Sequence, residues 1–423
     1  MSDAAPASPA VRRRRWPFVL AAVVVVLLAM AYWGSRPSRV ATAVLSRVEA
    51  ALGLEITVGG ASEYRLRDRP TLVLREVEVR QPGAATPLLQ AKRILLSLPW
   101  STLRARGAER VVHRVELDGP RFDLAAYQAW KATRPTAPTR LPTLTDGLQV
   151  ADGRILGGNW SIEHVDLDVP SFHPDRPVAA EVSGRYVSGR VAVPFAFRAA
   201  LTRPSRGAGL GLVGGVEVQA GTWRLPMAAI ASGRLHEGDD GLGLDRLRYA
   251  ADARYVGGSV DEPFALGLAG RLRYRDGRLQ LAPLGVGIGG TTLVPSLHAG
   301  GRLLLDDELA MALEGTLAQW PRAWPALPEP LGSSVSPLPF ELQYRGAPDL
   351  SGGTALRLER DGTHFDAAFR LPAVLEWLES RTSGTPLPPL RGKLVAPRLE
   401  IAGAQLHGVE IEFEDEPVTE SGR

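Results

Sequence analysis

The sequence predicts a mainly β protein. An N-terminal transmembrane helix and a short amphipathic helix precede a long curled antiparallel β-sheet, a groove or half-barrel, with a few short helices. Three observations lead to this fold class. The first 34 residues combine a basic cluster with a long uncharged run. Beyond residue 53, apolar and polar side chains alternate with a period of two, which is typical of strands with one apolar face. Glycine (45 residues) and proline (34 residues) recur between these segments, which indicates short strands joined by turns.

Residues 16–34 form the predicted membrane anchor. The run contains no charged residue and matches the roughly 17–25 residues that a helix needs to cross a bilayer. Aromatic residues at both ends suit the membrane–water boundary. The arginines lie before the run, so the positive-inside bias keeps residues 1–15 as a cytoplasmic tail and exports the rest. The residues that define the anchor are Arg12, Arg13, Arg14, Arg15, Trp16, Val23, Val24, Val25, Val26, Leu27, Leu28 and Trp33.

A cleaved signal peptide is the alternative interpretation of this region. Ala29-Met30-Ala31 fits a small-residue cleavage site. The apolar part of a signal peptide spans roughly 7–15 residues, whereas this run continues through the site to Trp33. We therefore favour a retained anchor, and both interpretations export the remaining chain.

Composition restricts the function classes. The apolar fraction of 45% is that of a globular protein rather than a disordered one. The net charge is +3, and four positive charges belong to the N-terminal arginine cluster, so the exported part is close to neutral and no nucleic-acid partner is expected. The chain has no cysteine, which excludes a disulfide framework, a thiolate metal site and a cysteine nucleophile.

Residues 35–130 are predicted to form a helix followed by the first part of the sheet. Apolar residues from Val40 to Leu52 recur at helical spacing, and Gly53 follows as a stop. Strands come next, with a bulge at Arg75-Glu76, where the alternation shifts by one residue. One face of these strands gives the candidate groove-lining residues: Leu72, Leu74, Val77, Val79, Ile94, Leu96, Leu98, Val115 and Leu117.

The rest of the chain continues the strand pattern, with two interruptions. Aspartate–glycine pairs predict hairpins at Asp152-Gly153, Asp276-Gly277 and Asp361-Gly362. Pro372 to Glu379 is predicted as a short helix with proline in its first turn. The predicted order is a linker, a central β region, a Pro/Trp-rich break in the sheet, a C-terminal β region and a disordered tail, at 131–146, 147–316, 317–338, 339–415 and 416–423.

No motif in the sequence favours an enzyme. Residues 209–214 fit G-x-G-x-x-G, but residues 216–219 alternate like a strand where a dinucleotide-binding loop needs a helix. His164 and Asp166 lie two residues apart in a strand-like segment and share a face. Without a third ligand we interpret them as a surface pair. The sequence therefore predicts no enzymatic activity, no cofactor and no metal site.

The order of segments in roughly the first third of the chain carries a resemblance. The anchor is followed by the helix 40–52, and then by strand-like segments at 52–58, 69–79, 89–98 and 112–120. This order resembles the N-terminal region of the AsmA-like family of bacterial envelope proteins. The segments 150–155 and 390–413 are similar to later strands of the family.

The resemblance implies a single-pass protein of the bacterial inner membrane with most of its chain in the periplasm. Its sheet would form a lipid-accommodating groove like those of bridge-like lipid transfer proteins. It further implies a role in outer-membrane biogenesis or phospholipid transfer. Membrane phospholipids, and outer-membrane assembly or other envelope proteins, are the implied partners.

The sequence leaves open how the apolar face of the sheet is covered. A sheet with one apolar face folds into a sandwich, closes into a barrel, or curls into a trough that something else covers. The trough favours lipid binding. A closed β-sandwich, acting as a non-lipid-binding scaffold or as a subunit of an envelope assembly or secretion machine, is the alternative.

Overall fold

The computed structural model describes most of the chain after residue 53. The predicted cytoplasmic tail, the anchor 16–34, most of the amphipathic helix and the C-terminal tail lie outside the described residues. Gly53, with φ of 58°, donates its N–H to the carbonyl of Glu49 at 2.7 Å. The described residues are 46, 49, 53–60, 62–65, 69–104, 111–133, 142–205, 207–290, 292–324, 327, 332, 334, 336–380, 389–401 and 404–414.

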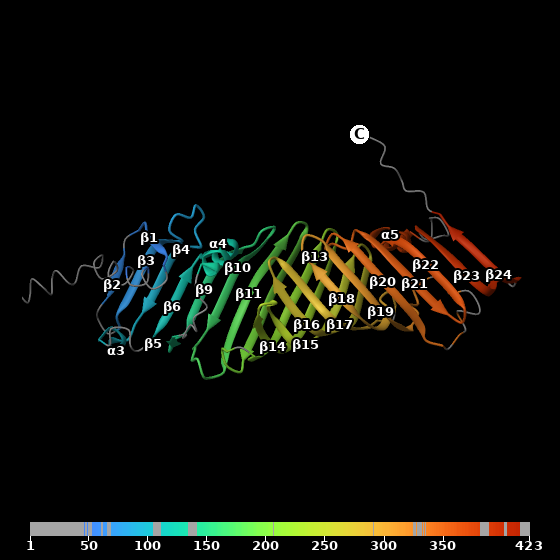
Figure 1. Cartoon of the computed structure of the whole chain (residues 1–423). Coiled ribbons are helices and arrows are strands. Elements are labelled where there is room, and N and C mark those ends of the chain that lie inside the picture. Colours follow the sequence, from blue (N-terminus) through green and yellow to red (C-terminus); the bar gives the residue numbers. More distant parts are fainter. Residues whose placement is uncertain are drawn as a thin grey trace, which may run out of the picture.

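The described chain is mainly β and forms one large curled sheet of 22 strands (Figure 1). Two further strands, β5 (Val111–Val112) and β8 (Thr143–Leu144), form a small parallel pair of their own. The strands of the large sheet are β1 (Glu55–Val58), β2 (Glu63–Arg65), β3 (Thr71–Arg80), β4 (Leu89–Ser97), β6 (Arg114–Asp118), β7 (Arg121–Asp123), β9 (Leu148–Leu156), β10 (Trp160–Val169), β11 (Val178–Ser188), β12 (Val191–Leu201), β13 (Gly209–Ala220), β14 (Trp223–Gly238), β15 (Gly241–Gly257), β16 (Val260–Arg275), β17 (Arg278–Gly289), β18 (Ser296–Leu305), β19 (Leu309–Gln319), β20 (Leu338–Gly346), β21 (Gly353–Arg360), β22 (Thr363–Arg370), β23 (Leu390–Ile401) and β24 (Ala404–Phe413).

Three short helices accompany the sheet in the described part of the chain after residue 53: α3 (Trp100–Arg104), α4 (Leu124–Ala132) and α5 (Leu371–Ser380). Helix α5 lies where the sequence predicts a short helix. Asp123 precedes α4, and its side chain accepts the N–H of Ala126 at 2.8 Å and so caps the first turn. In the part of the chain that the structure describes, no helix is both long and apolar enough to cross a membrane.

Two of the three predicted hairpins are confirmed. At Asp276-Gly277 and Asp361-Gly362 both residues have positive φ, between 50° and 83°, as a two-residue type I′ turn requires. The hairpin predicted at Asp152-Gly153 is wrong, because β9 continues through this pair to Leu156. Asp152 has φ of 50° and lies at an irregularity in the pairing with β10. An aspartate that tolerates positive φ serves a bulge as well as a turn.

The sheet is mixed rather than wholly antiparallel as the sequence predicts. Strands β6 and β7 both pair with β9 in parallel, and Val115 and Leu117 lie beside Leu148 and Val150. A parallel neighbour requires a connection long enough to return the chain to the same end of the sheet. Residues 124–147 are that connection. It includes α4 and the segment predicted as a linker, and the chain re-enters the sheet at β9.

The sheet continues across the segment predicted as a break. Leu317 of β19 pairs with Leu338 of β20, so the two strands are direct neighbours. Residues 320–337 are a long connection at one end of this pair. Trp320 and Leu327 from it pack against buried residues of the sheet. Pro321 follows the end of β19 and Pro337 precedes β20, and the apolar side chains of Trp320 and Leu327 hold this connection against the sheet.

One face of the sheet carries cross-strand ion pairs. Arg93 of β4 contacts Glu116 at 2.6 Å and Asp118 at 2.7 Å on β6. Arg273 of β16 reaches Asp240 at 2.8 Å and Asp245 at 2.6 Å. Its own side chain is only 12% exposed. We call this surface the polar face. The hydrogen bond from Arg273, followed by the contact with His236, lowers the pKa of Asp240 to about 2.

We expect Asp240→Asn to destabilise the protein at neutral pH but not in acid. A carboxyl whose folded pKa lies near 2 and whose unfolded pKa is about 3.9 contributes stability above the unfolded value. That contribution is lost as the pH falls through the folded value. Thermal unfolding of both proteins measured at pH 7 and then from about pH 4 to about pH 2 tests this. A difference in melting temperature that stays constant over this range would contradict it.

Candidate functional site

The side chains of the face opposite the polar face are predominantly aliphatic and aromatic. Register pairs place eight of the nine predicted lining residues on this face. Leu98 lies one residue beyond β4, where its N–H donates to the carbonyl of Pro70 at 2.9 Å. The eight fall in three groups of cross-strand neighbours: Leu72, Leu96 and Val115; Leu74, Ile94 and Leu117; and Val77 and Val79, which pair with Ala91 and Leu89.

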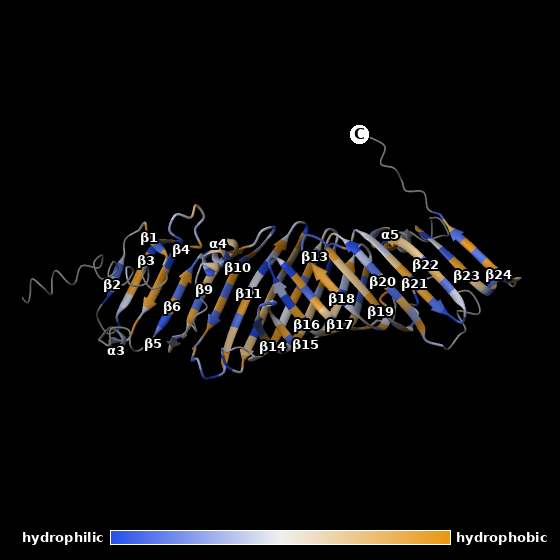
Figure 2. Ribbon diagram, viewed as in Figure 1, coloured by the Kyte–Doolittle hydropathy of each residue, from blue (hydrophilic) through white to orange (hydrophobic). Residues whose placement is uncertain are grey.

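The same face continues through the sheet to its last strand. Figure 2 shows hydrophobic and hydrophilic residues alternating along the strands over the length of the molecule. We call this surface the apolar face. Besides the eight residues above, its register pairs and alternation include Val150, Leu167, Val182, Phe197, Leu212, Val216, Met227, Tyr249, Leu266, Leu268, Val286, Leu297, Leu317, Phe340, Leu358, Phe365, Leu394 and Ile411.

Burial is uneven along the apolar face. Three separate clusters of buried residues occur among the described residues, one in β3 and two in the strands after β17. Between them, large side chains such as Leu212, Leu266 and Leu268 are only half-buried. A sandwich buries such residues in one contiguous core. The central strands therefore have an apolar face that the described chain covers only in part.

The sheet is also not closed into a barrel by the described strands. Strand β24 pairs with β23, and β1 and β2 pair with β3. The register pairs do not join these two ends of the sheet. The fold is therefore a curled open sheet in the part of the chain that the structure describes.

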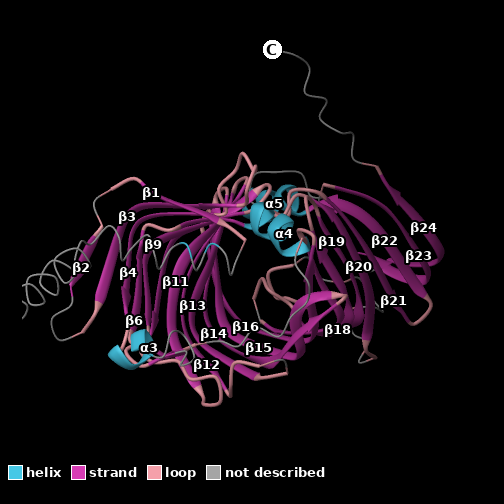
Figure 3. Cartoon of the chain, turned by 60° about the vertical axis from the view of Figure 1, so that its left-hand side comes forward, coloured by secondary structure: helices cyan, strands magenta, loops and turns pink. Residues whose placement is uncertain are grey.

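The apolar face lies on the inside of the curl. Phe122 of β7 lies beside Leu89 and Ile155, which belong to this face. Its ring is 5.3 Å from that of Tyr127 in α4, so the helix lies on the apolar side of the sheet. Figure 3 shows α4 between the opposing walls of the curl. The concave surface of the sheet is thus the aliphatic one.

One buried carboxylate lies on the apolar face. Glu262 of β16 is 8% exposed and accepts the backbone N–H groups of Thr292 at 3.1 Å and Leu293 at 3.2 Å. The carbonyl of Thr292 in turn accepts the N–H of Ala323 at 3.0 Å. Two N–H donors satisfy a buried carboxylate that would otherwise be costly. Glu262 therefore fixes the loop between β17 and β18 and, through it, the connection after β19.

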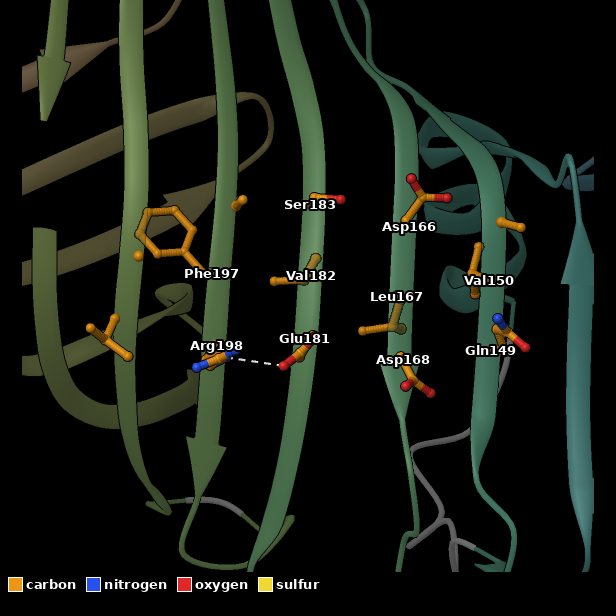
Figure 4. Close-up of a pocket in the computed structure, with 14 residues that line it drawn as sticks. Gln149, Val150, Asp166, Leu167, Asp168, Glu181, Val182, Ser183, Phe197 and Arg198 are labelled. Atoms are coloured by element: carbon orange, nitrogen blue, oxygen red, sulfur yellow. Dashed lines mark hydrogen bonds and ion pairs between the residues drawn. The ribbon is translucent and has the colours of Figure 1, made fainter. Parts of the chain in front are cut away.

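A cavity of about 660 Å³ is lined by β9 to β13 with residues of both faces, among them Leu167, Val182 and Phe197 of the apolar face. Its polar wall includes Asp166, Asp168, Glu181 and Arg198, which share the polar face by register. Figure 4 shows these side chains along the strands, with the helix α4 behind the sheet. Arg198 and Glu181 already pair with each other at 3.0 Å.

The predicted surface pair is only partly correct. The Nδ1 atom of His164 lies 3.0 Å from an oxygen of Asp152, not of Asp166. Asp166 instead accepts the N–H of Asp152 at 3.0 Å. His164 and Asp152 are 70% and 60% exposed. Among the described residues, no group of three potential ligands is placed to hold a metal ion.

The remaining predicted site residues are those of the membrane anchor. Arg12 to Arg15, Trp16, Val23 to Leu28 and Trp33 lie outside the described residues. The central strands were not among the predicted lining residues, although their alternation carries the same signal. Whether the apolar face binds lipid stays a prediction. No known protein family, curated protein or solved structure matches the chain.

We expect alanine substitutions on the apolar face to differ in cost according to position. Leu74→Ala, at a residue 6% exposed in a buried cluster, should lower the free energy of unfolding by about 2–4 kcal/mol. Leu212→Ala, on half-buried β13, should cost about 1 kcal/mol or less because it leaves no enclosed cavity. Chemical denaturation followed by tryptophan fluorescence compares the two. Equal losses would contradict an uncovered central face.

Proposed function

We propose that this protein accommodates the acyl chains of phospholipids along its apolar face, as an AsmA-like protein held in the inner membrane by residues 16–34. Its role is then in phospholipid transfer or outer-membrane biogenesis on the periplasmic side. The single observation that carries the proposal is the continuous apolar face, which is half-buried in the central strands although it lines the inside of a curl.

An acyl chain matches the chemistry of this surface. It offers no hydrogen-bonding group, so a continuous stripe of aliphatic side chains is sufficient to bind it. Each CH₂ group removed from water contributes about 0.8 kcal/mol. The half-buried leucines would lose their remaining water contact at the same time. No catalytic group is needed on the apolar face, and its buried carboxylate, Glu262, is occupied by two backbone donors.

The sheet offers room for several lipids. Strands β1 and β2 share one position beside β3, and β6 and β7 share another beside β4, so 22 strands occupy 20 lateral positions. A spacing of about 4.8 Å gives a path of roughly 90 Å along the sheet. An extended acyl chain occupies about 15 Å, half of a bilayer's hydrocarbon thickness. The apolar face is therefore long enough for transport along it as well as for binding at one place.

The alternative function is that of a scaffold for other envelope proteins, which would not need the concave apolar face. A scaffold would use the polar face, where cross-strand pairs such as Arg198–Glu181 are exposed. A scaffold sandwich would also bury its apolar face completely. The half-buried central leucines favour lipid over this alternative.

We expect Leu212→Asp to remove most of the bound phospholipid from the purified full chain. The two neighbouring residues Leu212 and Val213 point to opposite faces, and Val213 is 52% exposed. A carboxylate on the apolar face must be desolvated by any acyl chain that covers it, so we expect a loss of about ten-fold or more. Native mass spectrometry and labelling with a photoreactive acyl probe measure it.

Val213→Asp is the matched control, since it adds the same charge to the adjacent residue on the polar face. Circular dichroism confirms that both variants keep the β-sheet. The proposal fails when the unmodified protein carries no phospholipid and takes no label. Equal lipid loss in the two variants would also count against it, because the effect would then not depend on the face.

A further inference from the structure

Helix α4 leaves the sheet at one of its two long rims. It follows β7 directly, and β7 runs parallel to β9. From β9 to β14 every neighbouring pair of strands is antiparallel, so β14 runs opposite to β9. The rim at which β7 ends is therefore the rim at which β14 begins. The end of β14 lies on the other rim.

The far end of α4 nevertheless contacts the end of β14. The Nζ atom of Lys131 lies 3.9 Å from an Oε1 atom of Glu237, the second-last residue of that strand. By alternation Glu237 is on the apolar face, because it follows Met227 and Ala229 at even spacing. The C-terminal end of the helix, on the apolar side, thus lies near the rim of the sheet at which β14 ends.

A flat sheet would not allow this contact. Register pairs place Asp123, beside the start of α4, in the same row as Arg224 of β14, six neighbour steps away. Glu237 is 13 residues further along β14. With about 4.8 Å per step and 3.3 Å per residue, the flat separation is about 50 Å. The helix from Leu124 to Lys131 covers only about 10 Å. The curl of the sheet must therefore bring the end of β14 toward β7 until the helix can reach it.

Helix α4 does not pack on a buried core, since none of its residues is buried. Its larger side chains form a row with the ring of Phe122: Tyr127 lies 5.3 Å from Phe122 and 5.7 Å from Trp130. A helix that sealed a core would bury this stripe. Here an aromatic row stays half-exposed on the side of the sheet where the leucines of β9 to β14 are half-buried as well.

We propose that α4 is a strap, a helix that crosses the opening of the curl from the end of β7 to the end of β14. We call this opening the mouth, and the Lys131–Glu237 ion pair, which would hold the strap closed, the latch. The inference rests on the proposed function: the strap holds acyl chains against the apolar face, and its opening admits a phospholipid from the side. Lys131 and Glu237 are 58% and 45% exposed, and ion pairs between solvent-exposed side chains contribute little to stability. The latch therefore opens readily.

The chain has no cysteine, so a pair of introduced cysteines can fix the strap selectively. In the full-length double variant Lys131→Cys, Glu237→Cys, a bis-maleimide with a disulfide in its spacer links α4 to β14. Uptake of a fluorescent phospholipid from phosphatidylethanolamine–phosphatidylglycerol vesicles should slow by about ten-fold or more after linking. Reduction of the spacer should restore the rate.

The matched control is Glu181→Cys, Arg198→Cys, which links two neighbouring strands on the polar face without crossing the mouth. Uptake there should not change. Failure of the first pair to link at all, or unchanged uptake after linking, overturns the strap while leaving lipid binding intact. Absence of uptake in the unlinked protein instead overturns the proposed function.

Discussion

Every strand of this sheet must keep one apolar row of side chains on the inside of the curl, and the rest of the structure depends on that constraint. A slip of one residue would turn a whole strand over. Irregularities are therefore matched between neighbours. Between Leu74 and Val77 of β3 two residues intervene, and Glu76 takes φ of 51°. The paired residues of β4, Ile94 and Ala91, have the same spacing. Asp152 and His164 play this part in β9 and β10, with φ of 50° and 49°. The apolar face thus stays continuous while the strands bend.

The described residues cover this face only in places. Near β16 to β20, a buried glutamate fixes one loop, and the connection after β19 packs against a cluster that includes Leu317 and Phe340. Glu262 lies on the aliphatic surface, but its hydrogen bonds to backbone N–H groups assign it to holding structure. In the centre of the sheet the cover is α4, which is not packed on a core. Stability is concentrated where the chain seals itself. The half-buried centre is left for an occupant or for water.

The sequence predicts the local features well because they depend on neighbouring residues. Alternation identifies the strands, and Asp276-Gly277 and Asp361-Gly362 identify turns, since both positions require positive φ. The tolerance of aspartate for positive φ also led to the wrong hairpin at Asp152-Gly153, because a bulge and a tight turn both use positive φ. The parallel pairing of β6 with β9 could not be predicted, since it depends on where a long connection returns. The contact of Lys131 with Glu237 joins residues 106 positions apart and exists only because the sheet curls. For the candidate site, alternation placed the predicted residues of the first strands on one face of the sheet, while the uneven burial of that face could be seen only in the fold.

The weakness of the latch follows from what the strap would hold. An exposed ion pair contributes at most about 1 kcal/mol, whereas each buried CH₂ contributes about 0.8 kcal/mol. On the proposed function, an acyl chain of several CH₂ groups beneath α4 would stabilise the closed strap more than the ion pair does. It would also cover Tyr127 and Trp130, which are half-exposed without it. Closure is then linked to occupancy: the occupied curl keeps its strap, and the empty one releases it at little cost. A strong buried ion pair would hold the mouth closed whether or not lipid is bound. Lateral entry of a lipid therefore requires a weak ion pair.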